Sequence, residues 1–315
     1  MARSVAKRRR GVAHLPPVLV VAALAAGIVA GCGSSGPMPT VTGGFGSDPA
    51  ISIPGGTPAG QLTIQTVIQG HGPVIRADDY VITQVEGKVW AGDRLVVDSF
   101  TNRQPQGLPL RSGMPAWRHL AGQQVGSRVV MVVPPKDGFG PKGYSRLNIM
   151  GGDTLVFVFD ILRAFPDRSG ANGTAVPYRL GPGMPTVAWA GGGPQITVPP
   201  RTAPPSHLVV ALLRRGHGPR ILAGQTVATQ YTGVVWRTGK AFDSSWARGF
   251  PQTFVLGSGQ MLPGWEQGLG GLPVGSRVLL VIPPSLAYGR SAQPPYINSG
   301  DTLVFVIDIV AAVPG

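Results

Sequence analysis

"QYTGVVWRTGKAFDSS", residues 230–245, is the stretch that decides the fold of the second half of the chain. It continues a run rich in β-branched and aromatic residues, "TVATQYTGVVW" (226–236), which predicts a β-strand. Its end places an apolar residue, Phe242, directly before a carboxylate, Asp243, and Arg248 follows five positions later. Adjacent side chains of a strand alternate in direction. The phenylalanine can therefore line an apolar site while the aspartate turns to its rim, restrained by the arginine.

Three other segments show that the chain holds two copies of one unit. "QGHGP" (69–73) recurs as "RGHGP" (215–219), "VGSRVVMVVPP" (125–135) as "VGSRVLLVIPP" (274–284), and "GDTLVFVFDIL" (152–162) as "GDTLVFVIDIV" (300–310). The offsets of 146, 149 and 148 residues differ only by small loop insertions. Because a unit of about 115 residues has the size of a small domain, we predict two domains in tandem.

Strand patterns dominate each unit, and one short helix is expected. "SRVLLVIPP" and "TLVFVIDIV" predict further buried strands in the second unit. "GWEQGLG" predicts a helix that begins near Pro263, since proline is accepted in a first helical turn. Several antiparallel strands with one short helix give an α+β fold.

Composition suggests where the domains begin and end. We place them at 49–164 and 194–315. Residues 165–193, rich in Pro, Gly and Ser, are expected to form a linker with partial order around Val187 and Trp189, and residues 32–48 a flexible tether.

The N-terminus has the features of an export signal in the required order. A basic segment, "MARSVAKRRR", precedes an apolar run of 13 residues, "VLVVAALAAGIVA". That run is short of the ~20 residues that span a membrane and fits a signal peptide. The only cysteine, Cys32, follows two small residues, and the junction resembles a bacterial lipobox. The resemblance implies removal of residues 1–31 and lipid attachment at Cys32, which would anchor the protein to the outer face of the cell membrane.

Two points about this terminus stay open. A short buried apolar segment with an incidental cysteine is the alternative interpretation, and export by the general or the twin-arginine route is not decided. A single cysteine allows no intrachain disulfide.

The net charge of +13 does not point to a nucleic-acid site. Lys and Arg total 27 against 14 for Asp and Glu, and five of the cations lie in the first ten residues. The others are scattered, whereas a nucleic-acid-binding protein gathers cations in a patch. We expect a solvated basic surface, with attraction to an anionic membrane as the alternative.

Four segments of the second unit together resemble an FKBP-type peptidyl-prolyl isomerase. They are "QYTGVVWRTGKAFDSS" (230–245), "GQMLPGWEQGL" (259–269), "PPSLAYG" (283–289) and "GDTLVFVIDI" (300–309). Their order and spacing match the family without a gap from Phe242 through Phe305. The resemblance implies two tandem FKBP-like domains, each a half-wrapped antiparallel sheet around one short helix, and isomerase activity without metal or cofactor.

The resemblance also implies a set of site residues. Trp265 would form the floor of a proline pocket, Asp243 and Tyr288 its polar rim, and Arg248 would pair with Asp243. The backbone N–H of Ile297 would hold a substrate carbonyl. Catalytic roles fall to Asp243, Tyr288, Trp265 and Phe242, and substrate binding to Tyr231, Arg248, Met261, Leu262, Ile297 and Phe305. Gln252 and Gln293 depart from the family pattern, which has an aromatic and often a histidine there, and this puts ligand preference in doubt.

Each of these residues has a simpler interpretation when taken alone. Trp265, Phe305 and Tyr231 could be core aromatics, and Asp243 with Arg248 a surface ion pair worth ~0–1 kcal/mol. Their intact spacing across more than 60 residues favours a site instead.

The expected chemistry needs no nucleophile. The barrier to Xaa-Pro rotation, ~18–20 kcal/mol, arises from the partial double bond of the peptide. An apolar pocket that strips water favours the twisted, less polar amide, and fixed dipoles at the rim can hold its carbonyl. The sequence shows no Walker loop, Gly-x-Ser-x-Gly, paired cysteines or HExxH.

The first unit lacks part of this set. In our alignment Val85, Val97 and Phe139 stand for Tyr231, Phe242 and Tyr288, whereas Asp98, Trp117 and Phe157 are retained. We therefore expect a degenerate domain with weak or no isomerase activity.

Three functions remain in competition. The first is an isomerase that assists the folding of exported proteins at the cell surface, with its active site in the second unit. The others are a chaperone that only holds Pro-containing chains, and a structural envelope lipoprotein. Expected partners are Xaa-Pro polypeptides, immunosuppressive macrolides and, through the lipid, the membrane; no nucleic-acid partner is expected, and a monomer suffices.

Overall fold

The computed structural model describes residues 36–178 and 180–315. The predicted signal peptide and the lipid attachment at Cys32 lie outside these residues. Within the described ranges, no helix has both the length and the apolar character needed to cross a membrane.

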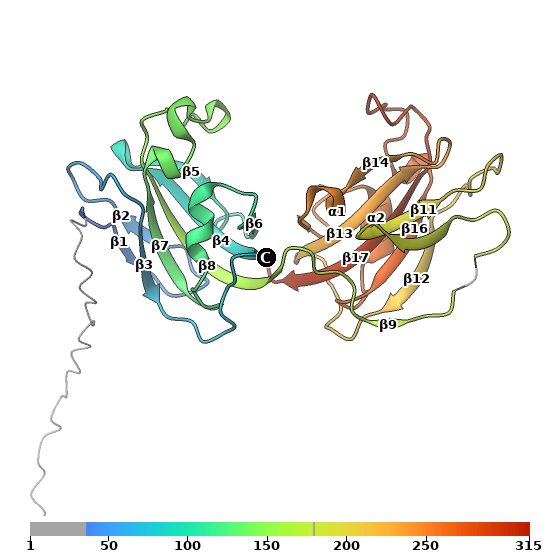
Figure 1. Ribbon diagram of the computed structural model, residues 1–315, viewed down its shortest axis with the longest axis horizontal. Coiled ribbons are helices and arrows are strands. Elements are labelled where there is room, and N and C mark those ends of the chain that lie inside the picture. Colours follow the sequence, from blue (N-terminus) through green and yellow to red (C-terminus); the bar gives the residue numbers. More distant parts are fainter. Residues whose placement is uncertain (1–35, 179) are drawn as a thin grey trace, which may run out of the picture. The chain divides into compact units, whose positions relative to one another are not determined.

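The N-terminal domain is a six-stranded antiparallel sheet in the order β3-β7-β8-β4-β5, with β6 paired to β4 (Figure 1). Its strands are β3 (Thr63–Ile68), β4 (Asp79–Val89), β5 (Arg94–Asp98), β6 (Gln106–Pro109), β7 (Arg128–Val133) and β8 (Leu155–Pro166). Its helical turns are all 3₁₀: Ala91–Asp93, Pro115–Leu120, Pro135–Asp137, Gly140–Lys142 and Ser145–Leu147.

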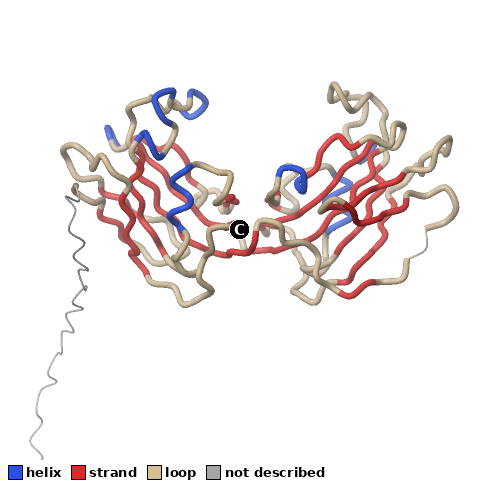
Figure 2. Tube along the Cα trace, in the orientation of Figure 1, coloured by secondary structure: helices blue, strands red, loops and turns tan. Residues whose placement is uncertain are grey.

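The C-terminal domain is a seven-stranded antiparallel sheet in the order β14-β13-β17-β16-β12-β9, with β15 paired to β13. Its strands are β9 (Thr174–Ala175), β12 (Val209–Arg215), β13 (Thr226–Val235), β14 (Ala241–Ser244), β15 (Gln252–Val255), β16 (Arg277–Ile282) and β17 (Leu303–Val313). Its helices are α1 (Ser245–Arg248), α2 (Pro263–Leu269) and the 3₁₀ turn Pro284–Leu286. Figure 2 shows how little of either domain is helical.

Both faces of each sheet are buried, which explains the unbroken apolar runs in the sequence. On β17, Phe305 and Ile307 face one cluster, which also holds Trp265 of α2, whereas Val304 and Val306 face the opposite cluster. This follows from the two-residue period of strand side chains. A strand buried on both faces needs apolar residues at every position.

A β-hairpin covers the second face of each sheet. In the N-terminal domain β1 (Thr40–Thr42) pairs with β2 (Ala50–Ser52). In the C-terminal domain β10 (Thr186–Ala190) pairs with β11 (Gly193–Thr197). Val41 and Ile51 pack under the first sheet, and Val187 and Ile196 under the second. The segment expected to be a flexible tether thus contains a packed strand, β1, because the apolar face beneath it supplies the order that its composition does not. In the linker, β10 spans the residues around which partial order was expected.

Candidate functional site

The helix α2 carries the central residue of the candidate site. Trp265 is 1% exposed and lies near the start of the helix, whose first residue is Pro263. Two buried glycines let α2 approach the sheet closely. A Cβ on Gly264 would lie 2.4 Å from Ile282, and one on Gly268 2.6 Å from Leu280.

Aromatic rings surround Trp265 with edge-to-face geometry. The ring centroids of Tyr231, Phe305 and Phe254 lie 5.1, 5.2 and 5.8 Å from that of Trp265. Phe242 stands edge-on to Phe305 at 5.5 Å. Ile297 is buried in the same cluster, and Met261 and Leu262 pack against it. We call this set the aromatic cluster; it unites every apolar residue predicted for the site.

A polar group of three side chains lies at the edge of this cluster. The Tyr231 hydroxyl donates to one carboxylate oxygen of Asp243, and Arg248 donates to the other. Arg248 also donates to the Tyr231 hydroxyl at 2.9 Å, and its guanidinium lies 5.5 Å from the centre of the Tyr231 ring. We call Tyr231, Asp243 and Arg248 the polar triad. It closes a ring of charge-assisted hydrogen bonds beside the apolar floor.

Tyr231 remains protonated over a wide pH range in this setting. Burial, followed by the hydrogen bond to Asp243, raises the pKa of Tyr231 to about 12. The hydroxyl is therefore a fixed donor at neutral pH.

A β-bulge, rather than regular alternation, brings Phe242 and Asp243 to the same site. Asp243 pairs with Gly233, the next pair is Ala241 with Val234, and Phe242 is the extra residue between them. In a bulge two residues oppose one on the partner strand. Phe242 can therefore contact Phe305 while Asp243 contacts Tyr231 of the same cluster. A Cβ on Gly233 would lie 2.7 Å from Phe242 and from Phe305, so this strand position requires glycine.

One prediction about the rim differs from the structure. The N–H of Ile297 donates to the carbonyl of Gln293 at 3.0 Å, so it is not free to hold a substrate carbonyl as expected. Residues 293 and 297 pair as a bridge that closes their loop and uses this donor. Tyr288 is 37% exposed, and its hydroxyl has no hydrogen-bond partner among the described residues. Tyr288 therefore lies outside the polar triad, and its role at the rim stays a prediction.

Phe254 is a cluster residue that the sequence interpretation missed. It is 5% exposed on β15, two positions after Gln252, whose side chain is exposed. The pattern of "QTFV" gave no signal for it, because residues two apart lie on the same side of a strand, and there Gln252 is exposed whereas Phe254 is buried.

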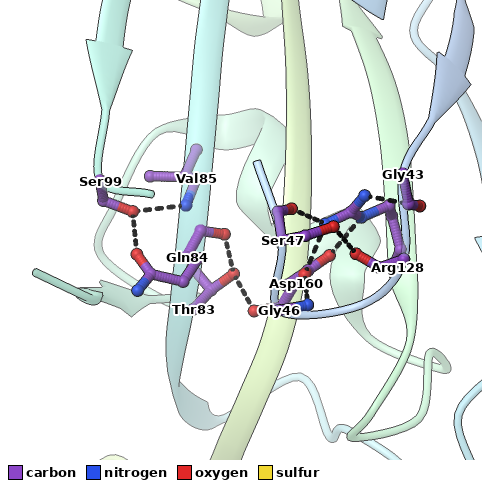
Figure 3. A network of polar contacts seen from close by, with 10 residues as sticks. Gly43, Gly46, Ser47, Thr83, Gln84, Val85, Ser99, Arg128 and Asp160 are labelled. Atoms are coloured by element: carbon purple, nitrogen blue, oxygen red, sulfur yellow. Dashed lines mark hydrogen bonds and ion pairs between the residues drawn. The ribbon is translucent and has the colours of Figure 1, made fainter. Parts of the chain in front are cut away.

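The N-terminal domain has no polar triad. The structure also shows that the alignment from sequence was wrong there by one residue. In Figure 3 the Ser99 hydroxyl accepts from the N–H of Val85 at 2.7 Å and donates to Gln84. Ser245 makes the same two bonds to Tyr231 and Gln230. Ser99 is thus the counterpart of Ser245 and not of Ser244.

Because of this shift of one residue, Asp98 is not the structural counterpart of Asp243. Gly87 pairs with Val97 as Gly233 pairs with Asp243, so a valine occupies the carboxylate position. Asp98 instead accepts from the N–H groups of Phe100 and Thr101, at 2.8 and 3.1 Å, and stabilises a turn.

The apolar floor persists in the N-terminal domain. Trp117 lies edge-on to Phe157 at 5.0 Å and to Phe159 at 5.3 Å. Its helix is 3₁₀ rather than α, and Ala116 stands at the position of Gly264. This domain thus has an aromatic floor without a polar rim.

Two further observations bear on other kinds of site. Within the described residues, no three His, Cys, Asp or Glu side chains gather as a metal site would require. A cavity of about 560 Å³ beside Trp236 and Arg237 lies away from the aromatic cluster, since Trp236 belongs to the hairpin-covered face.

The family follows from comparison with known proteins. The model of the family described as FKBP-type peptidyl-prolyl cis-trans isomerase matches residues 72–162 and 218–310. The fold, with two strand-rich antiparallel domains, agrees with this class of enzyme. The chain belongs to the FKBP-type peptidyl-prolyl cis-trans isomerases.

Several curated relatives are similar to one domain's length of this chain. The FK506-binding protein of Streptomyces anulatus is 49% identical over 113 residues, 36% of this chain and 91% of its own. A probable FK506-binding protein of Corynebacterium glutamicum is 41% identical over 119 residues, 38% of this chain and 98% of its own. The peptidyl-prolyl cis-trans isomerase FPR2 of Saccharomyces cerevisiae is 42% identical over 91 residues, 29% of this chain and 67% of its own.

Proposed function

We propose that the C-terminal domain catalyses cis–trans exchange at Xaa-Pro bonds and that the N-terminal domain contributes little or no catalysis. The observation that carries this proposal is the polar triad of Tyr231, Asp243 and Arg248 beside the aromatic cluster. The N-terminal domain keeps an aromatic floor, but Val85 and Val97 replace the tyrosine and the aspartate.

The mechanism uses the apolar floor and the polar rim together. The proline ring packs on Trp265 and its neighbouring rings, where water is excluded. Because rotation breaks amide resonance and lowers the polarity of the peptide bond, this environment favours the twisted state over the planar one. The triad supplies fixed dipoles toward the carbonyl that turns out of plane, without reorganisation during the reaction.

A donor for the substrate chain also lies beside the aromatic cluster. The N–H of Leu262, at the N-cap of α2, has no acceptor among the described residues. We assign it the carbonyl-binding role expected of Ile297, whose own N–H is occupied.

Paired variants of the two tryptophans test the proposal. Trp265→Leu should remove most acceleration of a protease-coupled Xaa-Pro assay with the full chain, and Trp117→Leu should leave the rate near that of the wild type. Equal losses in the two variants would refute the assignment. So would a wild-type chain that leaves the exchange time at its uncatalysed value of ~10–100 s.

Peptide holding without catalysis is the second candidate, and the N-terminal domain favours it. Trp117 is half-buried and lies over the buried Phe157 and Phe159, which leaves an apolar floor for a proline ring without a polar rim. A Pro-containing peptide that binds the Trp265→Leu variant but not the Trp265→Leu/Trp117→Leu variant would assign this role to the N-terminal domain. A purely structural envelope lipoprotein would show neither binding nor catalysis.

We further propose that the substrates are exported proteins and that the enzyme is lipid-anchored at Cys32 on the outer face of the membrane. The basic segment, apolar run and cysteine at 1–32 support this location. Cys32→Ser should release the protein from the membrane fraction of cells that express it; retention there would contradict the anchor. We also propose that an immunosuppressive macrolide binds at the aromatic cluster. The names of two relatives, which are FK506-binding proteins, support this.

A further inference from the structure

Arg248 lies on a helix that is too short to be stable by itself. It is the last residue of α1, a helix of four residues. Ser244 caps the helix by accepting from the N–H of Ala247 at 3.3 Å, and Gly249 ends it with a φ of +87°. A single turn is not stable in water without tertiary packing. The contacts of α1 therefore decide whether Arg248 stays on Asp243 and Tyr231.

Ser245 ties α1 to β13 through its bonds to Gln230 and Tyr231. The half-buried Trp246 packs on the other side of this attachment, against residues that precede the family-matched segment 218–310. The Trp246 ring lies edge-on to the Trp189 ring, with centroids 5.1 Å apart. A Cβ on Gly193 would lie 3.1 Å from the Cβ of Trp246, and one on Gly170 would lie 2.8 Å from its ring. Gly170, Trp189 and Gly193 thus pack against the Trp246 side chain.

Trp189 is fixed in turn to the central strands. The Arg277 guanidinium of β16 lies 4.1 Å from the centre of the Trp189 ring. Asp308 of β17 holds Arg277 with two hydrogen bonds of 2.6 and 2.7 Å and accepts from the N–H of Ala171 at 2.8 Å. The indole stays 47% exposed, so burial alone does not account for its position. A cation over its face supplies a specific attraction.

The N-terminal domain shows the same arrangement without the inserted tryptophan. Phe100 follows Ser99 as Trp246 follows Ser245, and the Arg128 guanidinium lies 5.6 Å from the centre of the Phe100 ring. Arg128 is saturated by Asp160 and by the carbonyls of Gly43 and Ser47 (Figure 3). In the C-terminal domain, by contrast, Trp189 lies between Arg277 and Trp246. This is the domain that has the polar triad.

We propose that the β10–β11 hairpin is a positioning element of the candidate proline site. Trp189, seated on Arg277, holds Trp246 and hence α1, and this keeps Arg248 on Asp243 and Tyr231. Trp189 is a positioning residue, because it acts through α1 and touches neither the triad nor the aromatic cluster. The proposal rests on the proposed function of the C-terminal domain, and it makes a segment preceding the family-matched region part of the enzyme.

A double-mutant cycle in the full chain tests the route through Arg248. Trp189→Ala should lower kcat/KM for an Xaa-Pro peptide by about three- to tenfold, the size expected for loss of one aromatic pair. Trp189→Phe should restore most of the rate. In an Arg248→Ala background, Trp189→Ala should cause no further loss, because contacting or linked residues are not additive. Additive losses would overturn the route through Arg248.

Hydrogen exchange provides a readout that does not need activity. The N–H of Gly249 donates to Ser245 within α1 at 2.9 Å, and its exchange should accelerate by about tenfold in Trp189→Ala. Trp236→Phe is the matched control, since Trp236 lies on the same sheet face and donates to Thr202 at 2.9 Å without contacting α1. Unchanged exchange at Gly249 in Trp189→Ala would overturn the positioning role. An inactive wild type with accelerated exchange in Trp189→Ala would refute only the proposed function.

Discussion

At the scale of single residues, Asp243 distinguishes the domain with a candidate site from the domain that has the fold without the polar triad. Its carboxylate accepts from both Tyr231 and Arg248, whereas Asp98, its apparent counterpart in sequence, only stabilises a turn. The two aspartates therefore form a matched pair for mutation.

Asp243→Asn should lower kcat/KM by about ten- to hundredfold. Asparagine keeps the shape but loses the charge, and hydrogen bonds to charged groups are worth ~1.5–3 kcal/mol. Asp98→Asn should change the rate by less than about twofold, because the asparagine oxygen can still accept from the backbone N–H groups. A protease-coupled assay on the full chain measures both. Similar effects of the two changes would show that the triad has no catalytic part.

The raised pKa of Tyr231, about 12, predicts an alkaline loss of stability. A tyrosine of the unfolded chain titrates near pH 10, so the unfolded state releases its proton first as the pH rises. The contribution is fully present below about pH 10 and is lost between about pH 10 and about pH 12. Tyr231→Phe should therefore flatten the fall of the unfolding free energy in this window, measured by urea denaturation at successive pH values. Tyr80 has the same raised pKa, so part of the fall should persist. An unchanged slope in Tyr231→Phe would show that the Tyr231 hydroxyl is not a source of the alkaline loss.

At the scale of elements, the contact between α2 and the sheet depends on two glycines. Alanine is a better helix former than glycine by ~1 kcal/mol. A Cβ on Gly264, however, would lie 2.4 Å from a side-chain carbon of Ile282, a distance that forces a shift.

Gly264→Ala should therefore destabilise the chain by ~1–3 kcal/mol, since overpacking outweighs helix propensity. Gln267→Ala, on the exposed side of the same helix, should be neutral or slightly stabilising. Urea denaturation of the two variants beside the wild type decides the question. A more stable Gly264→Ala would mean that α2 can move away from Ile282 at no cost.

The sequence was sufficient to predict the strands and the helix that have a local sequence signal. The expected strands at 226–236, 276–284 and 302–310 correspond to β13, β16 and β17, and the helix expected at Pro263 is α2. Their apolar runs and their proline are local signals. Most of the aromatic cluster was also predictable, because Tyr231, Trp265 and Phe305 lie on these elements and Phe242 on β14, whereas Phe254 on β15 was missed.

The sequence was insufficient where a contact far along the chain decides. Strand β1, in the expected tether, carries one apolar residue, Val41, which packs against the sheet face beneath it. The alignment of residues 96–99 with the second domain was wrong for another reason. A bulge adds one residue to a strand without changing composition, so the pair Asp98-Ser99 aligned by identity with Asp243-Ser244, whereas the backbone pairs it with one residue of offset.

At the scale of the whole molecule, the two domains share one buried ion pair and differ in how it is used. Arg128 and Asp160 are fully buried and hold the loop of the β1–β2 hairpin. In the other domain Arg277 remains 15% exposed and offers its free face to Trp189. The same ion pair thus anchors a hairpin in one domain and, in our proposal, positions a site in the other.

Asp160→Asn and Asp308→Asn should therefore have different consequences. Loss of one partner of a buried ion pair leaves an uncompensated charge and costs ~3–5 kcal/mol. Asp160→Asn should accelerate hydrogen exchange across β3, β7 and β8 while kcat/KM stays near the wild-type value, because this pair lies in the domain without the triad. Asp308→Asn should cost less stability, since its partner is less buried, yet it should lower kcat/KM by loosening Arg277 and Trp189. Exchange and peptide isomerisation measured on both variants give the comparison. A loss of activity confined to Asp160→Asn would place the catalytic centre in the N-terminal domain and reverse the division of roles.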